Sequence, residues 1–347
     1  MTPSGYRCFH ACERLYQYKY EQGIRPRKKA ASLTFGTLVH VALEAWWKAH
    51  QRGWGNTALE KARVALYEAR PENFDPYVFA AIDALIVGYD LMWGRHMSAI
   101  VVIAVEAEYR GPLHNPRTGV VADGFVSGGK IDILFSVNGT VYGMEHKTTS
   151  ADISPGSAYW IGLRMDPQLS AYFDGAEFLG HELDSFFYDV IKKPTIKPYK
   201  ATAEIKYTKG RKCGTRTKPC EGDACEQCGG SRWKEPARPR KGQRTADETV
   251  EEYRERLITE IGADPDKYYH RQRVVRLEDE LDESRLDFWY TALRIGVFEN
   301  THKPRNMQAC HRYGSTCAFW GVCTGSETLD SDKFERTGPH PELGIKA

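Results

Sequence analysis

The segment GKIDILFSVNGTVYGMEHKT, residues 129–148, determines the fold expected of this chain. Two apolar runs with strand-like alternation, 129–137 and 140–148, flank the dipeptide Asn-Gly. Asn-Gly between two such runs is a strong signal of a β-hairpin, because both residues accept the positive φ angles of a two-residue turn. The segment therefore predicts an antiparallel pair of strands.

The second strand of this hairpin carries charged residues near its end. Residues two apart in a strand face the same side, so Glu145 and Lys147 are expected to point together and His146 to point away. Counting back across the turn places Asp132 of the first strand close to Glu145. Two converging carboxylates suit Mg²⁺ or Mn²⁺, which prefer oxygen ligands, and a nearby lysine can stabilise charge on a phosphate. The hairpin thus predicts a site for phosphodiester hydrolysis.

The composition is that of a folded chain without a dominant charge. Its 347 residues are 41% hydrophobic and 27% charged, enough for one large domain or two modest ones with a sizeable core. The net charge of +2 does not by itself indicate a nucleic-acid partner. Local basic stretches occur at 25–29, 206–212 and 236–244, and each is either a phosphate contact or a solvated loop.

The chain carries no obvious membrane or export signal. It has no run of about 18 apolar residues, and its N-terminus lacks a basic start followed by an apolar stretch. We therefore expect no membrane span, no secretion and a cytoplasmic location. In that reducing compartment the nine cysteines are expected to include metal ligands rather than to form a disulfide framework.

Periodicity along the chain predicts an α/β fold with a central mixed β-sheet flanked by helices. Helical spacing occurs at 33–50, 57–70, 76–97, 164–180, 247–262 and 278–297, and further strand patterns occur at 99–110 and 185–193. Residues 1–324 are expected to form one domain, interrupted by a basic, cysteine-rich insertion at 194–247. The polar tail at 325–347 is expected to be loose.

Five short motifs follow one another in a recognisable order. They are Gly36-x-x-x-His40 on the first long helix, a glutamate on the next strand (Glu106, with Glu108 as its rival), Gly-x-x-Asp ending at Asp132, Glu145-x-Lys147, and Gln168-x-x-x-Tyr172 on the following helix. In this order they resemble the PD-(D/E)xK nuclease superfamily, specifically its RecB/AddB-type branch. That branch also contains CRISPR-adaptation nucleases and phage exonucleases.

The resemblance implies a metal-dependent deoxyribonuclease of the exonuclease or flap/end-processing type, acting in recombination, repair, phage replication or spacer processing. Its Mg²⁺ or Mn²⁺ ligands would be His40, Glu106, Asp132, Glu145 and the backbone carbonyl of the residue after Glu145. Lys147 would be the catalytic lysine, and Gln168 and Tyr172 would support the site or contact the DNA backbone. DNA is the implied partner, with a helicase, recombination or adaptation protein as a further one. The rival interpretation is a non-catalytic DNA-binding or structural subunit with the same fold.

Three cysteines interleaved with aromatic residues lie in ACHRYGSTCAFWGVC, at 310, 317 and 323, and suggest a soft-metal site that lacks one ligand. The N-terminal segment ACERLYQYKY resembles the branch's Cys-Pro-Arg-x-x-Tyr motif, with Glu13 in place of the proline. The resemblance implies a 4Fe–4S cluster held by Cys12, Cys310, Cys317 and Cys323. Cys8 is the alternative N-terminal ligand, and zinc is the alternative occupant.

The insertion carries its own set of cysteines, namely Cys213, Cys220, Cys225 and Cys228. The last two form a Cys-x-x-Cys-Gly-Gly turn typical of zinc knuckles. A segment with so few apolar residues needs a metal to become ordered, so a structural zinc site is predicted, and a flexible loop with reactive thiols is the alternative. The flanking basic residues predict contact with DNA or with a partner that holds DNA.

Overall fold

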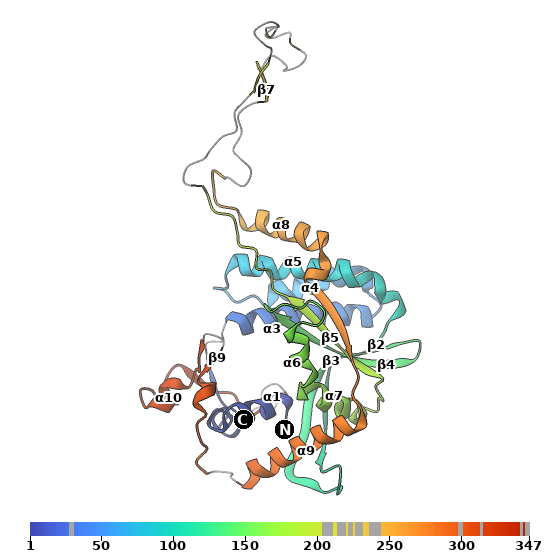
Figure 1. Ribbon diagram of the computed structural model, residues 1–347, viewed down its shortest axis with the longest axis vertical. Helices are drawn as coiled ribbons and strands as arrows, with labels where there is room; N and C mark the ends of the chain where they lie inside the picture. The colour runs from blue at the N-terminus through green and yellow to red at the C-terminus, as the bar shows by residue number, and fades with distance from the viewer. Residues whose placement is uncertain are drawn as a thin grey trace.

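A five-stranded sheet lies at the centre of the molecule, with the strand order β2-β3-β4-β5-β8 (Figure 1). The strands are β2 (Val101–His114), β3 (Val121–Val137), β4 (Thr140–Thr149), β5 (Ser185–Lys192) and β8 (Tyr269–Val274). Only β4 and β5 pair in parallel, so the sheet is mixed, as predicted. The computed structural model describes residues 1–27, 31–202, 211–213, 220, 225, 232–235, 244–297, 301–312, 315–340 and 343.

The Asn-Gly hairpin forms as expected between β3 and β4. Asn138 and Gly139 have φ angles of 51° and 84°, the positive pair that a type I′ turn requires. The turn sets the register of the hairpin, beginning with the pair Val137–Thr140. A longer connection then returns the chain to pair β5 in parallel with β4, and it contains α6 (Ala158–Arg164) and α7 (Pro167–Phe178).

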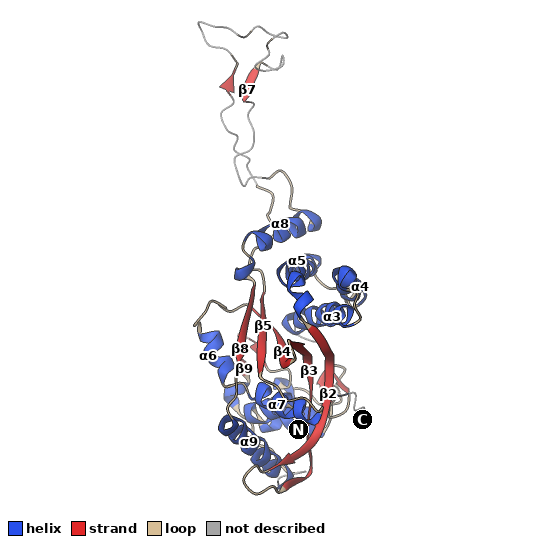
Figure 2. Ribbon diagram, turned by 90° about the vertical axis from the view of Figure 1, so that its right-hand side faces the viewer, coloured by secondary structure: helices blue, strands red, loops and turns tan. Residues whose placement is uncertain are grey.

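Helices cover both faces of the sheet (Figure 2). On one face lie α3 (Ala31–Gln51), α4 (Ala58–Glu68), α5 (Pro76–Trp93) and α8 (Val250–Ala263), which share a core with β3 and β4. On the other face α6 and α7 cover a second core, and α9 (Glu278–Val297) contacts α7. Because Trp46 and Trp47 of α3 are fully buried, α3 is held firmly over the strands of the hairpin.

One segment has the length and hydropathy of a membrane span. This segment, Pro76–Ala99, combines α5 with the 3-10 helix η3 (Gly94–Ala99). No other helix among the described residues is both long enough and apolar enough to span a membrane. More than half of its most apolar window, 56%, is buried inside the protein. Phe79, Ile82 and Leu85 belong to the core shared with α3, so the segment serves as a core helix here.

Two elements differ from the periodicity prediction. The helix expected at 164–180 is α7, which begins only at Pro167, because Asp166 caps it by accepting the N–H of Gln168 over 3.0 Å and Pro167 occupies its first turn; α6, just before it, is not among the predicted helices. The strand β8 has no counterpart among the predicted strands, because its sequence YHRQRV lacks apolar alternation. It nevertheless pairs with β5 along its whole length and closes that edge of the sheet.

The C-terminal tail, expected to be loose, is fixed to the N-terminal segment. Its strand β11 (Phe334–Arg336) pairs with β1 (Ile24–Pro26), and buried Phe334 stacks on Phe319 with ring centroids 4.9 Å apart. The two ends of the chain thus form one structural unit (Figure 1). Its other elements are α1 (Pro3–Ala11), α2 (Glu13–Tyr16), the π-helix η1 (Gln17–Glu21), η6 (Met307–Ala309), β9 (His311–Arg312), β10 (Ser315–Thr316) and α10 (Trp320–Thr324).

The expected insertion at 194–247 contains one small antiparallel pair among its described residues. It is formed by β6 (Arg211–Lys212) and β7 (Trp233–Glu235). Figures 1 and 2 show this pair well away from the central sheet, so it adds nothing to either core.

Candidate active site

The end of β4 carries the charged pair that the sequence places on one side of a strand. Lys147 Nζ donates a hydrogen bond to Glu145 Oε1 over 2.7 Å, so the two side chains do point together. His146 faces the opposite side, where its buried ring lies with Nδ1 3.0 Å from Asp189. The alternation expected of a strand therefore holds through the Glu-x-Lys motif.

Two further carboxylates lie at the same level on the neighbouring strands. The register of β3 with β4 brings Asp132 opposite Glu145, and the register of β2 with β3 brings Glu106 opposite Asp132. Glu106 has a φ of 54°, a left-handed conformation that costs a non-glycine residue about 1–3 kcal/mol and is concentrated at functional sites. Lys130 lies 3.5 Å from Glu106 and 3.6 Å from Glu108, but Glu106 is the glutamate that faces Asp132.

His40 reaches the carboxylates from α3. Its Nδ1 lies 3.6 Å from Asp132 Oδ2, and the ligand atoms of His40, Glu106 and Asp132 all lie within 4.8 Å of one another. Burial, together with the nearby His146, lowers the pKa of His40 to about 4. The imidazole is therefore neutral at neutral pH, which is the form that binds metal ions.

The electrostatics of this cluster fit a divalent cation. Burial and the neighbouring Glu145 and Glu106 raise the pKa of Asp132 well above its ordinary value, and burial also raises the pKa of Glu106. Glu145 Oε2 is buried without a hydrogen-bond partner among the described residues. A cation would satisfy this oxygen and offset the repulsion among the carboxylates. Carboxylate oxygens with one imidazole form a donor set suited to Mg²⁺ or Mn²⁺.

Gln168 and Tyr172 lie one turn apart on α7 and face the Glu-x-Lys motif. Gln168 Nε2 donates to Glu145 Oε1 over 2.7 Å and to the Tyr172 hydroxyl over 2.6 Å. Gln168 Oε1 accepts a hydrogen bond from Lys147 Nζ over 2.6 Å. One amide thus holds the carboxylate and the ammonium group in fixed positions, and Tyr172 orients that amide.

A buried polar network behind β4 is absent from the sequence predictions. Asp189 of β5 accepts hydrogen bonds from the Tyr89 hydroxyl over 2.6 Å and from Arg271 Nε over 3.0 Å, beside His146. Its sequence signal is a lone aspartate in the apolar strand pattern at 185–193, and its partners come from elements far away in the chain. The network supports the strand that carries Glu145 and Lys147 from behind.

The cysteines that the resemblance assigns to an iron–sulfur cluster come together where the chain ends meet. Cys12, Cys310, Cys317 and Cys323 line one pocket with Leu15, Tyr18 and Phe319, whereas Cys8 is not among its lining residues. No disulfide joins the described cysteines. Burial raises the pKa of Cys317 and of Cys323, and it raises the pKa of Cys8 to about 11.

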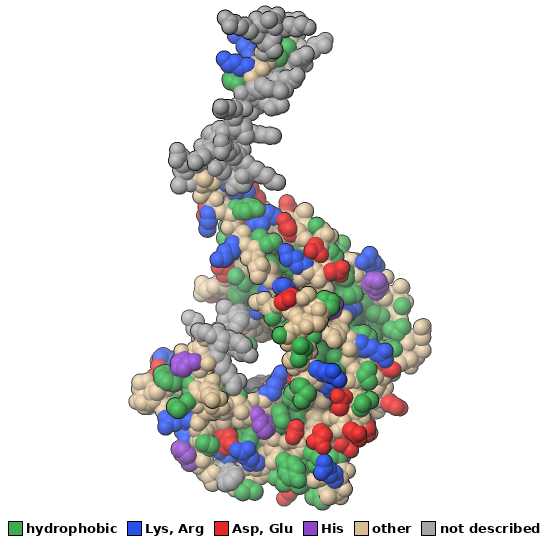
Figure 3. Space-filling model, viewed as in Figure 1, with side chains coloured by type: hydrophobic (Ala, Val, Ile, Leu, Met, Phe, Trp, Pro, Cys, Tyr) green, Lys and Arg blue, Asp and Glu red, His purple; other side chains and the backbone are tan. Residues whose placement is uncertain are grey.

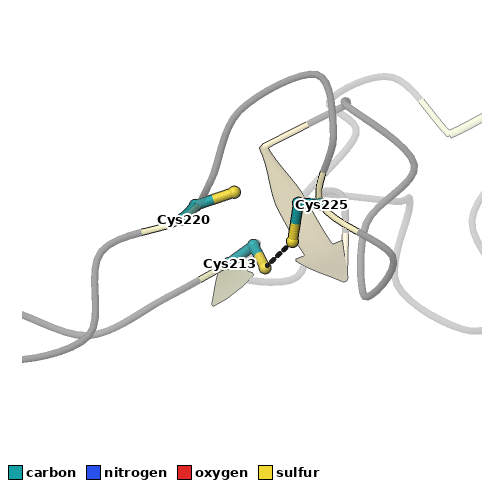
Figure 4. Close-up of side chains that lie close together, drawn as sticks. All are labelled: Cys213, Cys220 and Cys225. Atoms are coloured by element: carbon teal, nitrogen blue, oxygen red, sulfur yellow. Dashed lines mark hydrogen bonds between the residues drawn. The ribbon is translucent and has the colours of Figure 1, made fainter.

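Three cysteines of the insertion face one another (Figure 4). The sulfur atoms of Cys213, Cys220 and Cys225 lie within 4.8 Å of one another, with 3.6 Å between Cys213 and Cys225. Thiolates around one zinc ion are about 3.8 Å apart, because Zn–S bonds are about 2.3 Å long and tetrahedral, so this spacing fits zinc. Cys228, the fourth predicted ligand, lies outside the described residues.

A helix-flanked mixed sheet with three carboxylates, a histidine and a lysine gathered at its central strands defines the class of metal-dependent nucleases. The family model of the PD-(D/E)XK nuclease superfamily matches residues 1–324. The chain therefore belongs to this superfamily, whose members hydrolyse nucleic acids with the help of divalent metal ions.

Twelve chains of known structure match this chain, among them the following two. One is the crystal structure of a protein from Eubacterium rectale, provisionally described as an exonuclease. The two sequences are 13% identical, the match covers 95% of this chain and 89% of that chain, and the TM-score is 0.40. The other is the crystal structure of SSO0001, with 16% identity, 45% of this chain and 59% of that chain covered, and a TM-score of 0.22. The comparison with curated proteins gives no match.

Proposed function

We propose that this protein is a Mg²⁺- or Mn²⁺-dependent deoxyribonuclease of the RecB/AddB-type branch. It would process DNA ends as an exonuclease or flap nuclease in recombination, repair, phage replication or spacer processing. The observation that carries the proposal is the approach of His40, Glu106 and Asp132 to within 4.8 Å, next to the hydrogen-bonded pair of Glu145 and Lys147. A purely structural subunit has no need to keep this arrangement intact.

In the proposed reaction, one set of side chains binds the metal ion and another positions the attacking water. His40, Glu106, Asp132 and Glu145 would hold the metal, which when bound polarises the phosphate and lowers the pKa of water. Lys147, fixed between Glu145 Oε1 and Gln168 Oε1, would orient the attacking water. Its charge would also stabilise the phosphate oxygens as the bond from phosphorus to the leaving oxygen breaks. Gln168 would keep Lys147 in place rather than bind DNA.

Affinity for DNA would come from a few local contacts. Lys and Arg side chains are interspersed with Asp and Glu on the face shown in Figure 3, and the net charge is only +2. The electrostatic part of DNA binding grows with the number of phosphates that the protein neutralises. Each basic side chain beside the site therefore matters.

The test of the proposed function is cleavage of DNA labelled at its 5′ or 3′ end, single- or double-stranded, by protein purified without oxygen. We expect cleavage with Mg²⁺ or Mn²⁺ and none in excess EDTA. Early release of short labelled products from one end would define the polarity, and circular single strands would resist an exonuclease. If neither metal supports cleavage of any of these DNAs, the proposal is wrong.

A 4Fe–4S cluster held by Cys12, Cys310, Cys317 and Cys323 is part of this proposal, as is zinc bound by the insertion's cysteines. A single zinc ion would draw thiolates to about 3.8 Å from one another. Among the described cysteines, only Cys213, Cys220 and Cys225 form a set of three within 4.8 Å. The wider spacing in the pocket at the chain ends favours a larger, multi-iron group that would tie residue 12 to residues 310–323.

Replacing a cysteine of this pocket tests the cluster. Cys317→Ser is expected to abolish the brown colour of anaerobically purified protein and to lower the free energy of unfolding by about 2–5 kcal/mol, as for loss of a covalent link that closes a long loop. Visible absorbance and urea unfolding measure the two effects. Cys8→Ser is the matched control and should keep the colour, because Cys8 does not line the pocket. A colourless wild-type protein would rule the cluster out.

A further inference from the structure

The N-terminal helix α1 carries an arginine, Arg7, whose side chain reaches the candidate active site. α1 begins at its cap Thr2 and is anchored by Phe9, which is buried in a cluster shared with Ala171 of α7 and Phe288 of α9. From this anchored helix Arg7 extends toward the first turn of α7, where Gln168 lies. None of the five motifs in the sequence includes Arg7.

Arg7 shares a hydrogen-bond acceptor with Lys147. Its Nη2 donates to Gln168 Oε1 over 3.0 Å, and Lys147 Nζ donates to the same oxygen over 2.6 Å. Its Nη1 lies 3.5 Å from Asp166 Oδ2, the residue that caps α7. Two positive charges therefore converge on one neutral oxygen beside the metal-binding carboxylates.

The hydrogen-bonding capacity of Gln168 is fully used inside the protein. Its two N–H groups are bound to Glu145 and Tyr172, and its oxygen accepts from Lys147 and Arg7. An amide with four satisfied hydrogen bonds is fixed in orientation and has nothing left to offer a ligand. Gln168 therefore holds the side chains of Arg7 and Lys147 close to each other through one shared oxygen.

Arg7, in contrast, has donors to spare. A guanidinium group carries five N–H donors, and only the contacts with Gln168 and Asp166 engage it among the described residues. Its side chain is 44% exposed, whereas that of Asp166 is 7% exposed. The guanidinium group is therefore accessible to a ligand, and it shares the acceptor Gln168 Oε1 with Lys147. Planar guanidinium donors match the geometry of phosphate oxygens, and an anion between the two cations would offset their mutual repulsion.

We propose that Arg7 is a phosphate-binding residue of the active site, which contacts the substrate strand beside the phosphate that is cleaved. This inference rests on the proposed nuclease function and adds the N-terminal helix to the substrate-binding surface. Arg7 would reduce the energetic cost of bringing a polyanion to a site crowded with carboxylates. Because the net charge of the chain is only +2, the loss of one such contact should be measurable.

The test compares Arg7→Gln with Arg294→Gln. Arg294 binds the same N-terminal unit, with Nη2 2.5 Å from Glu13 Oε1 and its guanidinium 5.5 Å from the centroid of the Phe9 ring. Binding of a labelled single-stranded oligonucleotide is followed in EDTA, so that no cleavage occurs, over a range of salt concentrations. Arg7→Gln is expected to reduce the slope of log affinity against log salt by about 0.7, the value for one phosphate contact on a single strand. Arg294→Gln should keep the wild-type slope.

Cleavage supplies the second readout. Under single-turnover conditions with Mn²⁺, we expect Arg7→Gln to lower the rate about 10²-fold, as for loss of one positioned donor, and Arg7→Lys to restore the salt slope but only part of the rate. Wild-type slope and rate in Arg7→Gln, or equal losses in Arg294→Gln, would overturn the proposal. Failure of the nuclease function itself would look different, since wild-type protein would then not cleave at all while the binding comparison would still report on Arg7.

Discussion

Replacing Lys147 with alanine is expected to lower the rate of metal-dependent DNA cleavage by about 10²- to 10³-fold, the usual loss when one positioned charge-stabilising donor is removed. The lysine is held by Glu145 Oε1 at 2.7 Å and by Gln168 Oε1 at 2.6 Å, so its ammonium group is oriented before substrate arrives. Single-turnover cleavage of end-labelled DNA measures the effect.

A measurement of metal binding distinguishes loss of the catalytic lysine from loss of the whole metal site. Lys147→Ala should keep the rise in melting temperature that Mn²⁺ causes, because Lys147 is not one of the three grouped ligands, whereas Asp132→Ala should lose both that rise and cleavage. Lys200→Ala removes a lysine paired with Asp247 at 2.9 Å outside the site and should cleave normally. Full activity in Lys147→Ala would show that the assigned lysine is not catalytic.

Asp189→Ala is expected to lower the free energy of unfolding by about 3–5 kcal/mol, the cost of removing one partner of a buried ion pair. The carboxylate is fully buried, and its removal leaves Arg271, with 13% of its side chain exposed, without its counter-charge. Urea unfolding at neutral pH measures the loss. Asp123→Ala, at an exposed position of β3, is the control and should change stability by no more than about 0.5 kcal/mol.

The stabilisation by Asp189 should also depend on pH. Burial alone would raise the pKa of this carboxyl group, but Arg271 and His146 hold the pKa well below its ordinary value. A carboxyl group with a lowered pKa stabilises the fold above its unfolded-state pKa of about 3.9, and this contribution is lost as the pH falls below that value. The stability difference between wild type and Asp189→Ala should therefore be constant from pH 5 to 7 and shrink below about pH 4. A difference that grows on acidification would contradict this account.

The hairpin and its charged end could be predicted because their determinants are local. A two-residue Asn-Gly turn sets the register of β3 with β4, and strand alternation then orients Glu145, Lys147 and Asp132. Four of the five strands of the mixed sheet and its long flanking helices follow from periodicities that are visible over short windows. The strand β8 could not be predicted in this way, because its sequence YHRQRV lacks the alternation of apolar and polar residues that marks a half-buried strand.

The glutamate on β2 could not be assigned in this way. Glu106 and Glu108 are two residues apart, and alternation alone treats them alike. The left-handed backbone at Glu106, with a φ of 54°, breaks the regular alternation, and the pairing with β3 brings this glutamate to Asp132 and His40. A conformation of this kind is imposed by the surrounding structure and has no signature in the sequence.

By itself the sequence determined the α/β class, the antiparallel hairpin, the Glu-x-Lys pair on one side of a strand and the set of cysteines near both chain ends. The resemblance implied that His40, Glu106 and Asp132 share one metal ion, and the tertiary structure brings the three together. Only the tertiary structure decided that Asp189 supports β4 from behind and that Arg7 reaches Gln168. The reason is one of range. Turn chemistry and periodicity act between residues close in the chain, whereas these contacts join residues tens to hundreds of positions apart, and they exist only once the helices have packed on both faces of the sheet.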